Sequence, residues 1–216
     1  EEEEQEEKKK EEKEEKPEKV LSDDEVKKKA QDMMDEFYIC FETEEIRFCL
    51  EEMGSSSCHP LVVFTAILSI FEKLKHVDKL NGLFKDLHAD KTISTEHFKQ
   101  GFVMFFKNIE DLMMDYPLAS SIAAQFIGSA MVENIFDFEF LANETKELQL
   151  TRASLDLFLF TVDWLIQKKG EDVCKSKLSD GLVMKFVAGD KRTNDFITSY
   201  LERKKLMHLK PLLLSE

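Results

Sequence analysis

The chain has 216 residues, of which 43% are hydrophobic and 34% are charged, and its formal net charge is −14. This length and apolar content are sufficient for one or two domains with a buried core. Only seven Gly and four Pro occur, and alternating β-branched runs are scarce. The composition therefore predicts an all-α fold and argues against a sheet protein.

The charge is unevenly distributed along the chain. Residues 1–20 hold eleven Glu and six Lys, whereas residues 175–216 carry a net charge of +4, which leaves −13 for residues 21–174. An acidic central region disfavours direct nucleic-acid binding, because contacts with phosphates require Lys and Arg. It favours a basic protein partner through electrostatic steering, although simple solubility accounts for the net charge equally well.

The first twenty residues form a Glu/Lys segment of low complexity that is interrupted by Pro17. We interpret residues 1–20 as a charged linker or tail, because they cannot bury enough apolar surface to offset the entropy lost on ordering. An ordered domain is expected over residues 21–214, with a core block near 21–142 and following helices near 148–214. The chain begins within a charge run and without Met, so we expect it to be a fragment of a longer protein.

Helix signals follow one another through the ordered part. Caps are expected where Ser or Thr precedes a periodic apolar segment: Ser22 with Glu25, Thr43, and Ser94 or Thr95. The segments with helical periodicity are 26–38, 43–54, 61–74, 77–87, 98–106, 119–132, 135–142, 150–166, 171–178, 182–187, 194–200 and 206–214. Short loops between such helices favour antiparallel pairs stacked in a HEAT-like or armadillo-type superhelix.

The central stretch, residues 98–131, places an acidic turn between two apolar helices. Its first helix has aromatic residues at a spacing that predicts one buried stripe: Phe98, Phe102, Phe105 and Phe106. Pro117 cannot continue that helix, but it suits the first turn of the next one. Glu110, Asp111 and Asp115 therefore lie at a corner between two packed helices.

Asp111 and Asp115 are four residues apart, so on one helix they share a face. As a general acid and base they would need a pocket and a partner group, neither of which the sequence indicates. As acceptors for the Arg or Lys of another protein, they need only exposure and a rigid scaffold. Alternatively, Asp115 or Asn108 caps free N–H groups at a helix start. The residues alone leave capping, solvation and partner binding open.

No dinucleotide-binding, P-loop or nucleophile-elbow motif occurs in the sequence. Residues 86–97 approach the pattern of a calcium loop, but Lys91 stands where Gly is required and His97 stands where a bidentate Glu is required. The five histidines show no paired metal spacing. We therefore expect no enzyme, no cofactor, no metal site and no small-molecule substrate.

No secretory signal and no apolar run of about 18 residues is present, so we expect no membrane-spanning segment. The four cysteines form no CxxC pair, which is typical of a reducing compartment. These observations favour a cytoplasmic protein.

The central motif resembles the MA3 domain, which occurs in eukaryotic translation initiation factor 4 gamma and in programmed cell death protein 4. The resembling residues are Phe98-x-x-Gly101-Phe102, then Glu110-Asp111-x-x-x-Asp115-x-Pro117, then the Ala-rich helix ending near Val132. The first helices, within residues 21–53, are similar to the start of that domain in factor 4 gamma. Residues 155–166 and 178–204 are similar to the helices that follow it there, and residues 206–214 are similar to a divergent cap-independent relative of that factor.

The resemblance implies a stack of HEAT-like hairpins that docks the DEAD-box RNA helicase of initiation factor 4. It implies that Asp111 and Asp115 are the helicase-contacting positions, with Glu110, Tyr116 and Pro117 completing the partner-binding corner. A basic surface on the helicase would complement the acidic central region. We therefore expect a non-enzymatic adaptor domain of a translation initiation scaffold.

Two alternatives remain. One is an MA3 translation suppressor or splicing-associated protein that binds a helicase or another partner. The other is an RNA-binding module that uses the basic residues near the C-terminus, Arg203, Lys204, Lys205 and Lys210. A solvated face of the last helix is the simpler interpretation of those residues, so RNA binding is expected to be weak.

Overall fold

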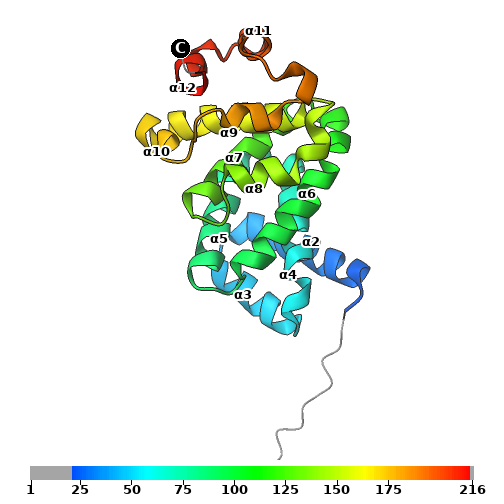
Figure 1. Ribbon diagram of the computed structural model, residues 1–216. Helices are drawn as coiled ribbons and strands as arrows, with labels where there is room; N and C mark the ends of the chain where they lie inside the picture. The colour runs from blue at the N-terminus through cyan, green and yellow to red at the C-terminus, as the bar shows by residue number, and fades with distance from the viewer. Residues whose placement is uncertain (1–20, 215–216) are drawn as a thin grey trace, which may run out of the picture.

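The computed structural model describes residues 21–214, so the expected charged tail, residues 1–20, lies outside the described residues. All regular elements of the described part are helical, which confirms the all-α fold (Figure 1). The α-helices are α2 (Asp23–Cys40), α3 (Thr43–Glu52), α4 (His59–Ser69), α5 (Val77–Ala89), α6 (Thr95–Asp115), α7 (Ala119–Val132), α8 (Phe138–Glu144), α9 (Ala153–Lys169), α10 (Glu171–Lys175), α11 (Asn194–Lys204) and α12 (Lys210–Leu213). The 3₁₀ helices are η1 (Ser56–Cys58), η2 (Ile70–Glu72), η3 (Leu74–His76), η4 (Lys146–Gln149), η5 (Leu182–Phe186), η6 (Gly189–Lys191) and η7 (Met207–Leu209).

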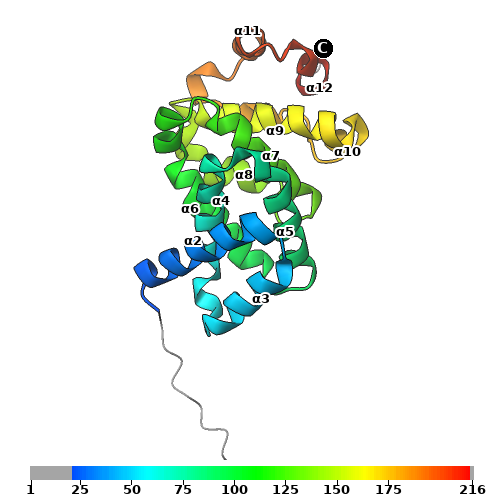
Figure 2. The ribbon, with the colours of Figure 1, turned by 180° about the vertical axis from the view of Figure 1, so that it is seen from behind.

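The helices stack in two layers. In one layer α4 packs against both α2 and α6, and in the other α5 contacts both α3 and α7. The stack then continues from α7 to α9. This alternation is the expected HEAT-like arrangement of helix pairs. Figures 1 and 2 show α9 crossing one end of the stack with α11 and α12 beyond it, so α2 and the C-terminus lie far apart.

Two of the expected helix caps are confirmed. The hydroxyl of Ser22 accepts a hydrogen bond from the backbone N–H of Glu25 at 3.3 Å, and the Glu25 carboxylate accepts one from the Ser22 N–H at 2.9 Å. The hydroxyl of Ser94 accepts one from the backbone N–H of His97 at 3.2 Å. Each cap satisfies N–H groups that the first turn leaves unpaired.

The expected cap at Thr43 is wrong. Thr43 is the first residue of α3, and the capping position is Glu42, whose side chain makes no capping hydrogen bond. The Thr43 hydroxyl instead donates to the carboxylate of Asp86 at 3.5 Å, a contact between α3 and α5. A long-range partner has displaced the local one, which a local motif cannot anticipate.

Several expected helices differ in their type or bounds. The segment predicted at 206–214 divides into the 3₁₀ helix η7 and the four-residue α12, and the one predicted at 150–166 begins at Ala153. The apolar helix predicted at residues 61–74 is α-helical only over His59–Ser69 and then tightens into η2. The segment predicted at 182–187 is the 3₁₀ helix η5. Helix ends often adopt this tighter form, and apolar periodicity does not distinguish the two.

Two glycines within helices allow neighbouring pairs to approach closely. A Cβ atom on Gly101 of α6 would lie 2.7 Å from Val63 and 2.8 Å from the carbonyl oxygen of Pro60, both in α4. A Cβ atom on Gly128 of α7 would lie 2.2 Å from the indole of Trp164 in α9. Glycine within a helix costs about 0.5–1 kcal/mol relative to Ala, so these positions trade local stability for close packing.

The predicted aromatic stripe of α6 is confirmed. Phe98, Phe102 and Phe105 have no exposed surface, and Phe106 is 1% exposed. The ring of Phe102 meets that of Phe136 edge-on, with centroids 4.9 Å apart. Burial of this stripe fixes the rotation of α6 about its axis, so the opposite face of its last turns points to solvent.

None of the described helices is by itself both long and apolar enough to span a membrane. The pair formed by α3 and residues 56–72 reaches the required length and composition only jointly, and it is bent by 117° at its break.

Candidate functional site

The corner between α6 and α7 is a tight backbone turn. The N–H of Tyr116 donates to the carbonyl of Leu112 at 2.7 Å, and the carbonyl of Tyr116 accepts from the N–H of Ala119 at 2.8 Å. Pro117 therefore precedes α7 and does not lie in its first turn as predicted, because Leu118 occupies the capping position. The chain turns between the two helices within three residues, and the two backbone hydrogen bonds of Tyr116 restrict the conformation of this turn.

The side chain of Tyr116 anchors the corner to the core. Its ring lies 5.4 Å from that of Phe71 in η2, with the planes tilted by 50°. The hydroxyl of Ser120 lies 3.4 Å from the sulfur of Met113, which links the two helices across the turn. These contacts hold the corner rigidly, as a preformed binding surface requires.

Asp111 and Asp115 both point to solvent. Within residues 21–214, neither carboxylate makes a hydrogen bond or an ion pair. The capping interpretation is therefore wrong for Asp115 and for Asn108. No side chain caps α7, and the amide of Asn108 donates to the carbonyl of Met104 within α6, at 2.8 Å. Solvation and partner binding remain as explanations of the two aspartates.

The location of these carboxylates is unfavourable for helix stability. Asp115 lies in the last turn of α6 and Asp111 one turn earlier, and the last turn contains no basic residue. The unpaired carbonyls at a helix C-terminus carry partial negative charge, so a carboxylate there is destabilising by about 0.3–1 kcal/mol. The helix dipole therefore does not favour aspartates at this end of α6.

Glu110 has a different environment from the two aspartates. It is half-buried, and its carboxylate accepts a close hydrogen bond from the hydroxyl of Thr151, just before α9. Glu110 and Tyr116 thus hold the corner in place, whereas Asp111, Asp115 and Pro117 are its exposed residues.

Sequence analysis missed the apolar side chains around the corner. Met114 is 77% exposed, Leu118 is 67% exposed and Leu150, next to Thr151, is 80% exposed. A signal was available for Met114, since it is four residues after Glu110 and off the buried Phe stripe. Exposed apolar side chains rimmed by charges are typical of protein-binding surfaces.

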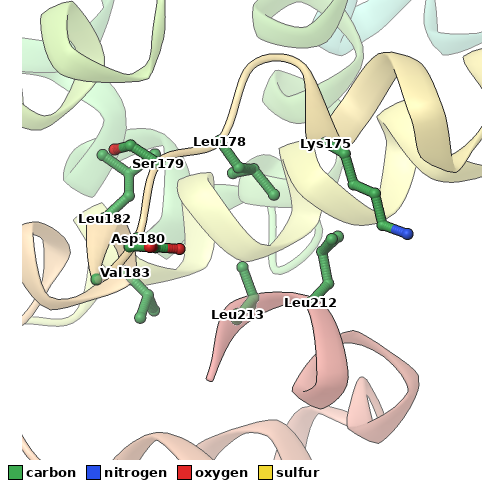
Figure 3. A pocket seen from close by; sticks show the side chains of 9 residues that line it. Lys175, Leu178, Ser179, Asp180, Leu182, Val183, Leu212 and Leu213 are labelled. Carbon is green, nitrogen blue, oxygen red and sulfur yellow. The ribbon is translucent and has the colours of Figure 1, made fainter. Parts of the chain in front are cut away.

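Two hollows of the described residues lie away from the corner. A hollow of about 170 Å³ lies between the α10–η5 loop and α12, where Leu212 and Leu213 project towards Leu178 (Figure 3). An open groove of about 490 Å³ lies beside the end of α2. Neither includes Asp111 or Asp115, so neither supplies the pocket that acid–base catalysis by this pair would need.

The segment that approaches a calcium loop, residues 86–97, is engaged by the chain itself. The carboxylate of Asp90 accepts hydrogen bonds from the Arg47 guanidinium at 2.7 Å and from the backbone N–H of Thr92 at 2.9 Å. Among the described residues, no group of three or more His, Cys, Asp or Glu is arranged to hold a metal ion.

The basic residues of the RNA-binding alternative do not form one helix face. Lys204 donates to the buried carboxylate of Asp156 at 2.8 Å. The guanidinium of Arg203 lies 4.8 Å from the ring centre of Tyr200. Lys205 caps α11 with a φ of 60°, and Lys210 begins α12. At least one of the four cations, Lys204, therefore pairs with a carboxylate of this chain and is not available to RNA.

Comparison with known proteins shows which protein family the corner and its two helices resemble. A family model described as the MA3 domain matches residues 26–137, which include the whole corner. MA3 domain-containing translation regulatory factor 3 of Arabidopsis thaliana is 28% identical over 59% of the chain and 18% of its own length. Eukaryotic translation initiation factor 4G is 27% identical over 50% of the chain and 6% of its length in Cucumis melo, and 24% identical over 84% and 10% in Oryza sativa. The chain spans less than a fifth of the length of each of these relatives.

Proposed function

Because the chain belongs to the MA3 domain family, we propose that it is a non-enzymatic adaptor domain that docks the DEAD-box RNA helicase of initiation factor 4. The contact is made by Asp111 and Asp115. The observation that carries this proposal is that both carboxylates are exposed on a rigid corner and have no partner within residues 21–214.

Physical chemistry supports this assignment. Arg and Lys of a partner form charge-assisted hydrogen bonds with carboxylates, and such bonds are stronger when a neighbouring apolar surface excludes water. Met114 and Leu118 supply that apolar surface. The acidic central region would also steer a basic partner to the corner.

The names of the relatives connect the family with translation initiation and its regulation, so we place the adaptor in the cytoplasm, where translation begins. We propose that residues 21–142 and the helices over 148–214 act as one folded unit, since α7 packs directly on α9. A translation regulator that competes for the helicase is the second candidate, and the relative named as a translation regulatory factor favours it. A second MA3 copy in the full-length protein would distinguish this regulator from an initiation scaffold.

The test is the affinity of the 216-residue chain for the purified helicase, measured by isothermal titration calorimetry. Replacing both Asp111 and Asp115 with Lys should weaken binding about thirtyfold or more, because the interface would then oppose like charges. The matched control replaces Glu51 and Glu52, two exposed carboxylates at the C-terminal end of α3, with Lys and should leave the affinity unchanged. Equal affinities for the wild type and the Asp111→Lys/Asp115→Lys variant would refute the proposal.

A further inference from the structure

The acidic corner is directly connected to the start of α9. The hydrogen bond between Glu110 and Thr151 joins two segments that are 41 residues apart in the chain. Asp111 follows Glu110 on α6, and Arg152 follows Thr151 at the capping position of α9. Residues just before α9 therefore border the corner, although they lie outside the region 26–137 that the MA3 family model matches.

Apolar side chains lie on both sides of this hydrogen bond. Met114 is four residues after Glu110 and three after Asp111, so it lies beside both on the surface of α6. Leu150 precedes Thr151 in the chain and is 80% exposed. Side chains of this size lose water-contacting surface when another protein covers them, which favours association.

The residue after Thr151, Arg152, carries a cation that no carboxylate of residues 21–214 neutralises. The guanidinium of Arg152 lies over two rings of α11, with its carbon 6.0 Å from the ring centre of Phe196 and 5.9 Å from that of Tyr200. Within residues 21–214 no carboxylate pairs with it. A guanidinium held against ring faces keeps its charge and leaves N–H groups free to bind a carboxylate in a bidentate manner.

The backbone of Arg152 places this side chain at the start of α9. Its φ of 71° is in the left-handed region, which residues with a Cβ atom rarely adopt. The carbonyl of Arg152 still accepts the first hydrogen bond of α9, from the N–H of Asp156 at 3.0 Å. The guanidinium is thus positioned by a fixed turn and by two rings of another helix.

We propose that one protein partner covers the acidic corner and the start of α9 together, so that basic groups meet Asp111 and Asp115 while a carboxylate meets Arg152. Between these charged contacts, an apolar side chain of the partner covers Met114 and Leu150. This inference rests on the proposed function and adds to it a second contact of opposite sign. The partner surface is therefore bipolar, and a uniformly basic protein fits only half of this site.

The test uses the same helicase titration with variants at the start of α9. Arg152→Glu should weaken binding about tenfold or more, and Leu150→Ala about three- to tenfold, which are typical losses for central interface residues. Arg152→Gly should weaken binding as well, and because Gly accepts the positive φ, its loss of affinity cannot come from added backbone strain. Matched controls are Lys168→Glu, an exposed cation near the other end of α9, and Ile39→Ala, an apolar side chain of α2 that is 83% exposed.

The outcomes separate this inference from the proposal on which it rests. If Asp111→Lys/Asp115→Lys abolishes binding while the Arg152 and Leu150 variants bind as the wild type does, the composite surface is refuted and the helicase contact stands. If the aspartate variant binds normally, or the wild type does not bind, both fall. Loss of affinity in the Arg152 and Leu150 variants, with both controls unchanged, establishes the composite surface.

Discussion

Carboxylates cluster at both ends of α6, and the two ends differ in how the chain uses them. Before the helix, Asp90 accepts hydrogen bonds from Arg47 at 2.7 Å and from Thr92 at 2.9 Å. At its end, Asp111 and Asp115 have no hydrogen bond or ion pair within residues 21–214. A carboxylate before α6 thus stabilises a loop of this chain, whereas the two carboxylates at the end of α6 remain available to a partner.

The electrostatic environment of Asp90 shows the same contrast. Partial burial by itself would raise the pKa of Asp90, but hydrogen bonds from Thr92 and Arg47 outweigh it and hold the pKa below its usual value. The ionised form of Asp90 therefore stabilises the loop before α6. At the far end, by contrast, the two free carboxylates face the negative end of the helix dipole.

Charge reversal at each end of α6 should produce opposite phenotypes, and this is the largest effect we expect. Asp111→Lys with Asp115→Lys should cost about 2–5 kcal/mol of helicase binding without lowering the Tm, because a cation is favourable at the negative end of a helix. Asp86→Lys with Asp90→Lys should lower the Tm, because Arg47 then faces like charges, and leave binding intact. Calorimetric titration and thermal unfolding of both variants check this. Equal loss of binding in a folded Asp86/Asp90 variant would contradict the comparison.

The next largest effect is expected on stability, at the close contact between Gly101 of α6 and helix α4. Gly101→Ala should destabilise the fold by about 1–3 kcal/mol, because the carbonyl of Pro60 cannot move away from the added methyl group. Gly82→Ala is the matched control: Gly82 is exposed within α5, and a methyl group added there would meet no atom within 4 Å, so this change should stabilise by about 0.4–1 kcal/mol. Urea unfolding monitored by circular dichroism measures both, and stabilisation by Gly101→Ala would be the contrary result.

Neutralising the corner should separate stability from binding. Asp111→Asn with Asp115→Asn should weaken helicase binding, yet raise the free energy of unfolding by about 0.3–1 kcal/mol, because an unfavourable charge is removed from the end of α6. Urea titration of the variant beside the wild type provides the measurement. A clear loss of stability would show that the carboxylates support the fold.

The smallest expected effect is the pH dependence of the loop before α6. Since the pKa of Asp90 is lowered in the folded state, its contribution is complete above the unfolded pKa of about 3.9 and is lost as pH falls through the lower folded value. Asp90→Asn should thus lower the Tm by about 1–3 °C at pH 6. Thermal unfolding between pH 3 and pH 6 should show this difference shrinking below pH 4, and a difference that grows instead would contradict the assigned cause.

Local sequence patterns predicted much of this protein correctly. The Phe spacing of α6 predicted its buried stripe, and Ser22 and Ser94 predicted two helix starts. The location of the acidic corner followed from Pro117 and the apolar segments on either side. Such features depend on neighbours within one or two helical turns, so the sequence is sufficient to identify them.

Contacts between distant segments decided the rest. Thr43 bonds Asp86 instead of capping α3, Glu110 bonds Thr151 41 residues later, and Asp111 finds no donor at all among residues 21–214. The sequence by itself determined the helices, their buried faces and the position of the corner, because periodicity and capping act locally. Only the tertiary structure decided which carboxylates are neutralised and which remain free, because hydrogen-bond partners depend on how remote helices pack together.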